Sequence, residues 1–215
     1  ISVLTSLSGA VSILWRHPKV SLMGIVKVIN LAGQYGMQVY YIVYLQKVYG
    51  MAESSAILTF TVFGVVAVVG DVVWGVLGDR FGWRNTLQWV ATPVTAVSLA
   101  YLYVIPMVAG PSFWLISLGM AGVGIGLSAH VPTTPLIMAH AKGETGNALA
   151  ILNFGAGLGT FVGPGLVALF IGNENTAGGY LGPGMALAGI YVLSFIILFW
   201  LRLPGNARVL HSQAE

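Results

Sequence analysis

Charged residues are scarce in this sequence. Nine Lys or Arg and six Asp or Glu make up only 7% of the 215 residues, and 57% of the chain is hydrophobic. A soluble domain of this length carries about 25% charged residues. Together with a mean hydropathy of +0.87, the composition excludes an ordinary water-soluble domain and predicts a membrane protein.

Cysteine is absent, which excludes a disulfide scaffold and a thiolate metal site. The H-E-x-x-H, G-x-S-x-G and phosphate-loop patterns of enzymes are also missing, as is a pair of intramembrane aspartates. We therefore expect no enzyme, no cofactor and no metal. The net charge of +3 is better explained by basic cytoplasmic loops than by binding of nucleic acid.

Long apolar runs dominate what is present. Six of them approach the ~20 residues that a helix needs to cross a bilayer. We expect spans at 20–46, 54–78, 86–106, 112–138, 147–171 and 180–202. The sequence thus predicts an all-α membrane protein with a six-helix transmembrane domain over 20–203. Residues 1–19 are expected to form a cytoplasmic loop with an amphipathic surface helix over 1–15, and residues 204–215 a cytoplasmic tail.

The basic residues predict the orientation of the spans. If the first basic flank is cytoplasmic, seven Lys or Arg lie on that side and one lies opposite, a strong asymmetry. The seven are Arg16, Lys19, Arg80, Arg84, Lys142, Arg202 and Arg208, and the one is Lys47. We therefore expect a multi-pass protein of the cytoplasmic (inner) membrane with both termini in the cytoplasm. No leader pattern is visible, so we expect no signal peptide.

Small residues in two spans predict close helix packing. In the second span they recur at steps of three or four, and in the fifth span at steps of four. In the second span Gly64, Ala67, Gly75 and Gly78 share this spacing with Phe60 and Asp71, and in the fifth span the set is Gly155, Gly159 and Gly163. In the fourth span, Pro132 and Pro135 should bend the helix near its cytoplasmic end.

Polar residues follow one face of the first span. They are spaced by three or four residues and comprise Lys27, Asn30, Gln34, Gln38 and Tyr41. Such a row is costly against lipid, so it should face protein or a watery cavity. Amides and phenols both donate and accept hydrogen bonds, as a neutral polyhydroxylated ligand requires. Hydrogen bonding between helices without a ligand remains the structural alternative.

Four ionisable or polar residues have two interpretations each. Lys27 either binds the substrate or an ion-pair partner, or snorkels to the interface. Asp71 lies at a similar depth, so a Lys27–Asp71 pair is a hypothesis, with a gate contact as the other role of Asp71. His130 either responds to protons or bonds a neighbouring helix or a carbonyl freed by proline. Asn153 is a weaker cavity candidate, if the glycine face of its span is interior.

The connection after the second span gathers charge between two apolar runs. Asp79, Arg80 and Arg84 lie there, among glycines that allow a tight reversal. This hairpin resembles the signature loop of the major facilitator superfamily, roughly G-x-L-a-D-r-x-G-r-k. The matching residues are Gly75, Leu77, Asp79, Arg80, Gly82 and Arg84, whereas Trp83 replaces a second basic residue.

The resemblance implies the carboxyl-terminal half of a twelve-helix fold, helices seven to twelve. The polar row is similar to the seventh helix of sugar porters, and the run 34–41 looks most like bacterial ribitol and arabinitol permeases. The function that the resemblance implies is transport of a small polyol or sugar by alternating access, with proton symport. Gly75, Asp79, Arg80, Gly82 and Arg84 would then serve gating, with Asp79 meeting a helix terminus of the other half.

The resemblance also implies a partner. An amino-terminal six-helix half, on the same or a separate chain, would complete the cavity. Three alternatives stay open: an organic-anion carrier in which Lys27 binds a carboxylate, a drug exporter of the same superfamily, and a membrane subunit that does not transport.

Overall fold

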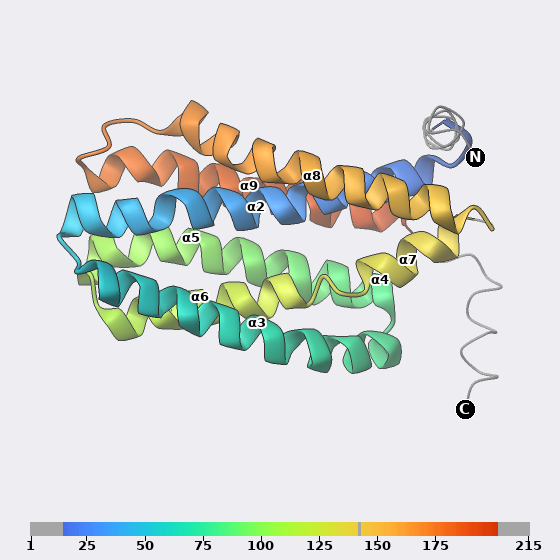
Figure 1. The fold of residues 1–215 in the computed structure, drawn as a ribbon, viewed down its shortest axis with the longest axis horizontal. Coiled ribbons are helices and arrows are strands. Elements are labelled where there is room, and N and C mark those ends of the chain that lie inside the picture. Colours follow the sequence, from blue (N-terminus) through green and yellow to red (C-terminus); the bar gives the residue numbers. More distant parts are fainter. Residues whose placement is uncertain (1–14, 142, 202–215) are drawn as a thin grey trace.

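The computed structural model describes residues 15–141 and 143–201. Most of the predicted surface helix, the tail over 204–215, and Lys142, Arg202 and Arg208 therefore lie outside the described residues. Throughout the described part the regular structure is helical, which confirms the predicted all-α bundle. The long helices run side by side along one axis (Figure 1).

The helices follow the six predicted runs. α2 (Pro18–Tyr49), α3 (Glu53–Phe81), α8 (Thr145–Phe170) and α9 (Ala177–Trp200) each fill one run. α4 (Trp83–Thr86), the π-helix η1 (Leu87–Ala91) and α5 (Thr92–Ala109) share the third, and α6 (Phe113–Ser128) and α7 (Thr133–His140) share the fourth. Within the described ranges, five helical segments are long and apolar enough to cross a membrane. α2, with its polar row, is not among the five although its 32 residues are sufficient.

The glycine stripe of α8 packs directly on the backbone of α2. A Cβ atom added to Gly155 would lie 2.7 Å from the carbonyl oxygen of Gly24, and one added to Gly159 would lie 2.7 Å from that of Val28. Gly163 meets the backbone of Ala32 in the same way. The predicted close packing of this span is therefore confirmed, and it makes α8 the main neighbour of α2.

The packed face of α3 agrees with the prediction in part, since Phe60 and Ala67 pack against the core. Cβ atoms added to Gly64 and Gly75 would have no atom within 4 Å, so these glycines lie in open space. Gly70 contacts Ser128 instead, and Gly78 contacts Pro132. Because small residues occur on several sides of α3, their spacing alone did not indicate which side meets α6.

The fourth run contains a break rather than a smooth bend. α6 ends at Ser128 and α7 begins at Thr133. Between them the amide of His130 donates to the Leu127 carbonyl oxygen at 3.1 Å, three residues back instead of four. Pro132 lacks an N–H and cannot continue the α-helical ladder. The predicted distortion is confirmed, and it separates α7 from α6.

Candidate functional site

The polar row of α2 has different surroundings along its length. Asn30 is only 6% exposed, whereas Lys27, Gln34 and Gln38 are half-buried. Within the described ranges the side chains of Gln34 and Gln38 make no hydrogen bond. Two amides on one helix face thus keep donors and acceptors free for another partner.

Tyr41 does not share this environment. Its side chain is fully buried, and its hydroxyl donates to the carbonyl oxygen of Leu102 at 2.9 Å. Pro106 lies four residues after Leu102 inside α5 and has no N–H for that carbonyl, so the tyrosine supplies the missing donor. The predicted ligand-binding role of Tyr41 is corrected to a structural one, because its hydroxyl is already used.

A tyrosine cluster surrounds Tyr41 and was not predicted. The ring centroids of Tyr41 and Tyr103 are 5.3 Å apart, and those of Tyr44 and Tyr180 are 4.7 Å apart. The Tyr44 hydroxyl donates to the Tyr103 carbonyl oxygen at 3.1 Å. These residues come from α2, α5 and α9, so no local pattern in the sequence groups them.

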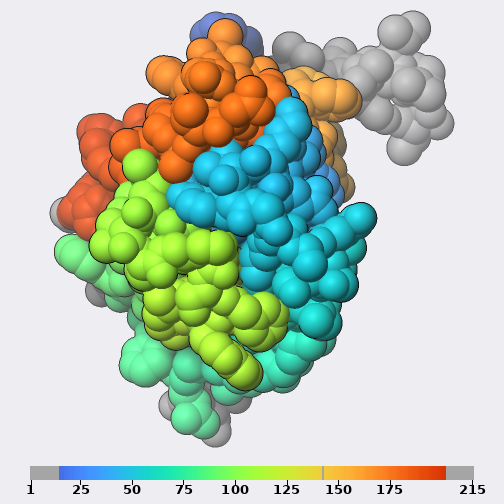
Figure 2. Space-filling model, turned by 90° about the vertical axis from the view of Figure 1, so that its left-hand side faces the viewer, coloured from blue at the N-terminus to red at the C-terminus, as the bar shows by residue number. Residues whose placement is uncertain are grey.

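The end of the bundle next to this cluster joins α2 to the α8–α9 connection. Lys47 Nζ lies 2.8 Å from Glu174 Oε2, and both side chains are about half exposed. Figure 2 views this end, with the end of α2 in light blue beside the orange connection. We call it the Lys47 end.

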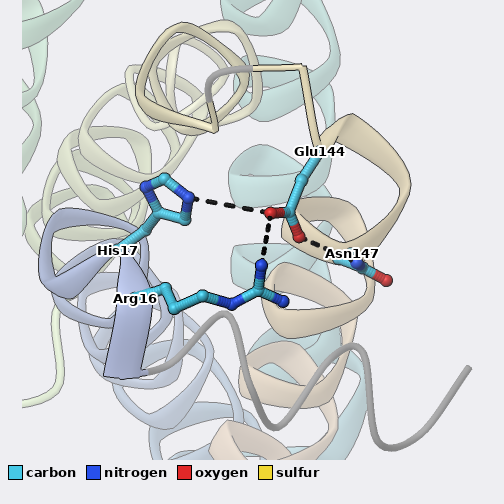
Figure 3. A network of polar contacts seen from close by, with 4 residues as sticks. All are labelled: Arg16, His17, Glu144 and Asn147. Carbon is cyan, nitrogen blue, oxygen red and sulfur yellow. Dashed lines mark hydrogen bonds and ion pairs between the residues drawn. The ribbon is translucent and has the colours of Figure 1, made fainter.

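The opposite end, here the Arg16 end, holds a second polar network. Glu144 precedes α8 and accepts a hydrogen bond from Arg16 at 3.3 Å and one from Asn147 at 3.1 Å (Figure 3). His17 Nε2 lies 3.8 Å from the same carboxylate. The start of α2 is thus tied to the start of α8, as its other end is tied to the α8–α9 connection.

Lys27 and Asp71 do not form a contact ion pair. Among the residues the structure describes, no carboxylate lies within 4.0 Å of Lys27. Asp71 is exposed on α3. The hypothesis of a direct pair is therefore wrong for this conformation.

His130 belongs to a buried cluster around Tyr191. His130 is 3% exposed, its Nδ1 lies 3.0 Å from the Gly126 carbonyl oxygen, and its ring centroid lies 5.9 Å from that of Tyr191. The Tyr191 hydroxyl donates to the backbone oxygen of Asn30 at 3.0 Å. The structure therefore brings Asn30 and His130, which are one hundred positions apart in sequence, to one aromatic side chain.

Asn153 lies away from these residues. The glycine stripe of α8 is interior, as expected, but Asn153 is exposed. It lies two positions before Gly155, and this step corresponds to about 200° around the helix axis. Its predicted place on the interior face of α8 is therefore wrong.

The hairpin after α3 turns at Gly82, whose φ of +90° favours glycine. Trp83 Nε1 donates to Asp79 Oδ1 at 2.7 Å. Arg84 Nε donates to the Leu198 carbonyl oxygen at 2.7 Å, and its guanidinium carbon lies 6.0 Å from the centre of the Phe199 ring. Arg80 is exposed. The two arginines thus differ, because only Arg84 anchors the hairpin to α9.

A metal centre is not visible in this arrangement. The described residues contain no group of three or more His, Asp or Glu that could hold a metal ion. The chemistry available at the site is hydrogen bonding by amides and imidazole, together with the positive charge of Lys27.

Comparison with known proteins decides the family. The model of the Major Facilitator Superfamily matches residues 6–214. The chain belongs to the Major Facilitator Superfamily. With its apolar helices, this membership makes it a multi-pass membrane protein and confirms the predicted fold as a six-helix half of a facilitator.

The curated relatives of this facilitator chain are named for different substrates. An alpha-ketoglutarate permease of Bacillus subtilis (strain 168) is 32% identical over 207 residues, which cover 96% of this chain and 46% of the relative. A D-arabinitol transporter of Klebsiella pneumoniae is 25% identical over 203 residues (94% and 47%). A ribitol transporter of the same organism is 23% identical over 209 residues (96% and 48%).

The chain spans about half the length of these curated relatives. The resemblance to ribitol and arabinitol carriers is confirmed at the level of relatedness. At position 83 the chain has a tryptophan where the superfamily signature has a second basic residue. The indole N–H of Trp83 donates a hydrogen bond to the Asp79 carboxylate.

Proposed function

We propose that this chain forms the carboxyl-terminal half of a secondary active transporter. It moves a small polyol or sugar across the cytoplasmic membrane by alternating access, with proton symport and both termini in the cytoplasm. The observation that carries the proposal is the polar face of α2, where Gln34 and Gln38 are half-buried amides. Each amide can donate to and accept from one hydroxyl group, which is the chemistry of a polyhydroxylated solute.

The proposed partner is an amino-terminal six-helix half, on this polypeptide or another. Open small residues on α3, namely Gly64 and Gly75, would allow its helices to approach closely. Asp71, Asp79, Arg80, Gly82 and Arg84 would adjust the balance between outward-open and inward-open states. Such transporters hold the solute between two halves that rock around it.

An organic anion is the second candidate cargo. Lys27 is a half-buried cation on the same face as the amides, and a carboxylate is its natural ligand. One relative is an alpha-ketoglutarate permease, which supports this candidate as the polyol carriers support the first.

Uptake in cells that express the complete gene tests the proposal. Radiolabelled ribitol and arabinitol are offered to cells with wild type, Gln34→Ala, Gln38→Ala, and the control Asn153→Ala on exposed α8 surface. We expect saturable uptake that an uncoupler abolishes, that both glutamine variants lose, and that the control keeps. Absent uptake in wild type, or unchanged uptake in both glutamine variants, contradicts the polyol assignment and leaves the organic anion.

A further inference from the structure

We propose that His130 and Asn30 form a subsite for a hydroxyl group of the solute, and that Lys27 beside it takes a carboxylate. The substrate class that satisfies all three side chains is a small hydroxy acid. This inference rests on the proposed function. It combines the two candidate substrates, a polyol and an organic anion, because a hydroxy acid carries both hydroxyl groups and a carboxylate.

The first step is the tautomer of His130. Its amide N–H donates to Leu127 because the chain leaves the α-helical path, so the Gly126 carbonyl oxygen loses its helical donor. Nδ1 lies 3.0 Å from that oxygen. A carbonyl only accepts, so Nδ1 carries the hydrogen, and in the neutral imidazole Nε2 is then a bare acceptor.

The second step is that Nε2 has no donor. It is buried, and no hydrogen bond reaches it from any residue between 15 and 201 that the structure describes. The side-chain oxygen of Asn30, Oδ1, is buried and without a partner in the same way. Buried polar atoms are nearly always bonded, so each of these acceptors calls for a donor from outside the described chain.

The third step is that the two residues that carry these acceptors both contact Tyr191. Tyr191 donates its hydroxyl to the Asn30 backbone and packs its ring against His130. Gly33 leaves room for this ring, since a Cβ atom there would lie 2.7 Å from Tyr191 Cζ. The free acceptors on these two residues suit an O–H group and disfavour a carboxylate oxygen, which only accepts.

The fourth step adds the charge. Lys27 lies three residues before Asn30, so the two side chains are neighbours on the same helix face. Among the described residues, Lys27 has no ion-pair partner, and Asp71 is exposed on α3. In a hydroxy acid, the carboxylate would bind to Lys27 and a neighbouring hydroxyl group would donate to the acceptors of Asn30 and His130.

Three five-carbon probes separate these contributions. Ribonate carries hydroxyls and a carboxylate, ribitol carries hydroxyls only, and glutarate carries carboxylates only. Their Kd values are measured by calorimetry on the purified complete protein in detergent. We expect ribonate to bind roughly tenfold tighter than either other probe, as one additional charge-assisted contact implies.

Variants then assign each group to its residue. Lys27→Gln should weaken ribonate about tenfold, to the level of ribitol, and leave ribitol unchanged. His130→Phe should weaken ribonate and ribitol about tenfold and leave glutarate unchanged, whereas His130→Gln, which keeps an acceptor, should retain most of the affinity. His140→Phe is the matched control, because His140 is equally buried and also places Nδ1 on the carbonyl four residues back.

Several results overturn the inference. Equal Kd values for ribonate and ribitol remove the carboxylate site at Lys27. A His130→Phe variant that melts at a lower temperature but keeps all three Kd values shows that an internal water, not the solute, supplies the donor. If ribitol binds and ribonate does not, the proposed function stands and this inference falls; if none of the probes binds to wild type, the proposed function falls first.

Discussion

The contact between α8 and α2 allows a prediction with a worked magnitude. A Cβ atom on Gly159 would lie 2.6 Å from Leu31 Cβ, 2.7 Å from the Val28 carbonyl oxygen and 3.1 Å from the Ala32 nitrogen. Carbon atoms attract best at about 3.5–4.0 Å. Gly159→Ala must therefore push the helices apart by roughly 1 Å, since two of the three obstacles are backbone atoms that no rotamer can move.

The matched control is Gly157→Ala on the same helix, where an added Cβ would have no atom within 4 Å. Both substitutions gain about 1 kcal/mol of helix propensity, so this gain cancels in the comparison. Overpacking costs about 1–3 kcal/mol. We expect Gly159→Ala to be less stable than Gly157→Ala by about this amount.

Equilibrium unfolding in mixed micelles with increasing sodium dodecyl sulfate, followed by circular dichroism, measures the difference. Gly189→Ala on α9 is a second control, because that position is also open. Equal stability of Gly159→Ala and Gly157→Ala would refute the reasoning, since it would mean that α8 does not touch the α2 backbone.

Three further predictions use the same unfolding assay. Tyr41→Phe leaves the Leu102 carbonyl without its donor and should cost about 1–3 kcal/mol while solute affinity stays unchanged; a lost affinity would return Tyr41 to the binding face. Arg84→Gln should cost about 1–3 kcal/mol through its bond to Leu198, against less than about 0.5 kcal/mol for exposed Arg80→Gln; equal costs would contradict the anchoring role. A double-mutant cycle on exposed Lys47 and Glu174 should give a small coupling free energy. This coupling should disappear at about 1 M salt, where the Debye length is ~3 Å, and its persistence there would contradict a surface ion pair.

Regular spacing was a good guide where one pattern repeats on one helix. The four-residue steps of Gly155, Gly159 and Gly163 indicated a packed face, and Gly82 indicated the turn of the hairpin. Spacing was right only in part on α3, where Gly78 is packed and Gly64 and Gly75 are open, because the position of α6 decides which small residues are covered. The prediction for Asn153 also failed. Its position around the helix axis places it away from the buried glycine face of α8, although it is polar and close to these glycines in sequence.

Contacts between helices could not be predicted from the chain alone. Tyr44, Tyr103 and Tyr180 meet from three helices, and the meeting of Asn30 with His130 at Tyr191 requires the arrangement of α2, α6 and α9. One signal was present for Tyr41: Pro106 leaves the Leu102 carbonyl without a helical donor. The sequence alone does not indicate which side chain donates to this carbonyl, because many side chains in the chain could supply a hydrogen-bond donor.

The contacts along α2 imply that some helices of the bundle can move more easily than others. α2 is held to the start of α8 at the Arg16 end, to the α8–α9 connection at the Lys47 end and to α8 itself along the glycine stripe. We expect these contacts to resist rotation of α2 against α8. His130 lies instead in the interruption between α6 and α7, where the helical ladder is open. Moving α2 against α8 would break the contacts at both ends and along the stripe, whereas tilting α7 against α6 at the interruption would break no complete α-helical turn.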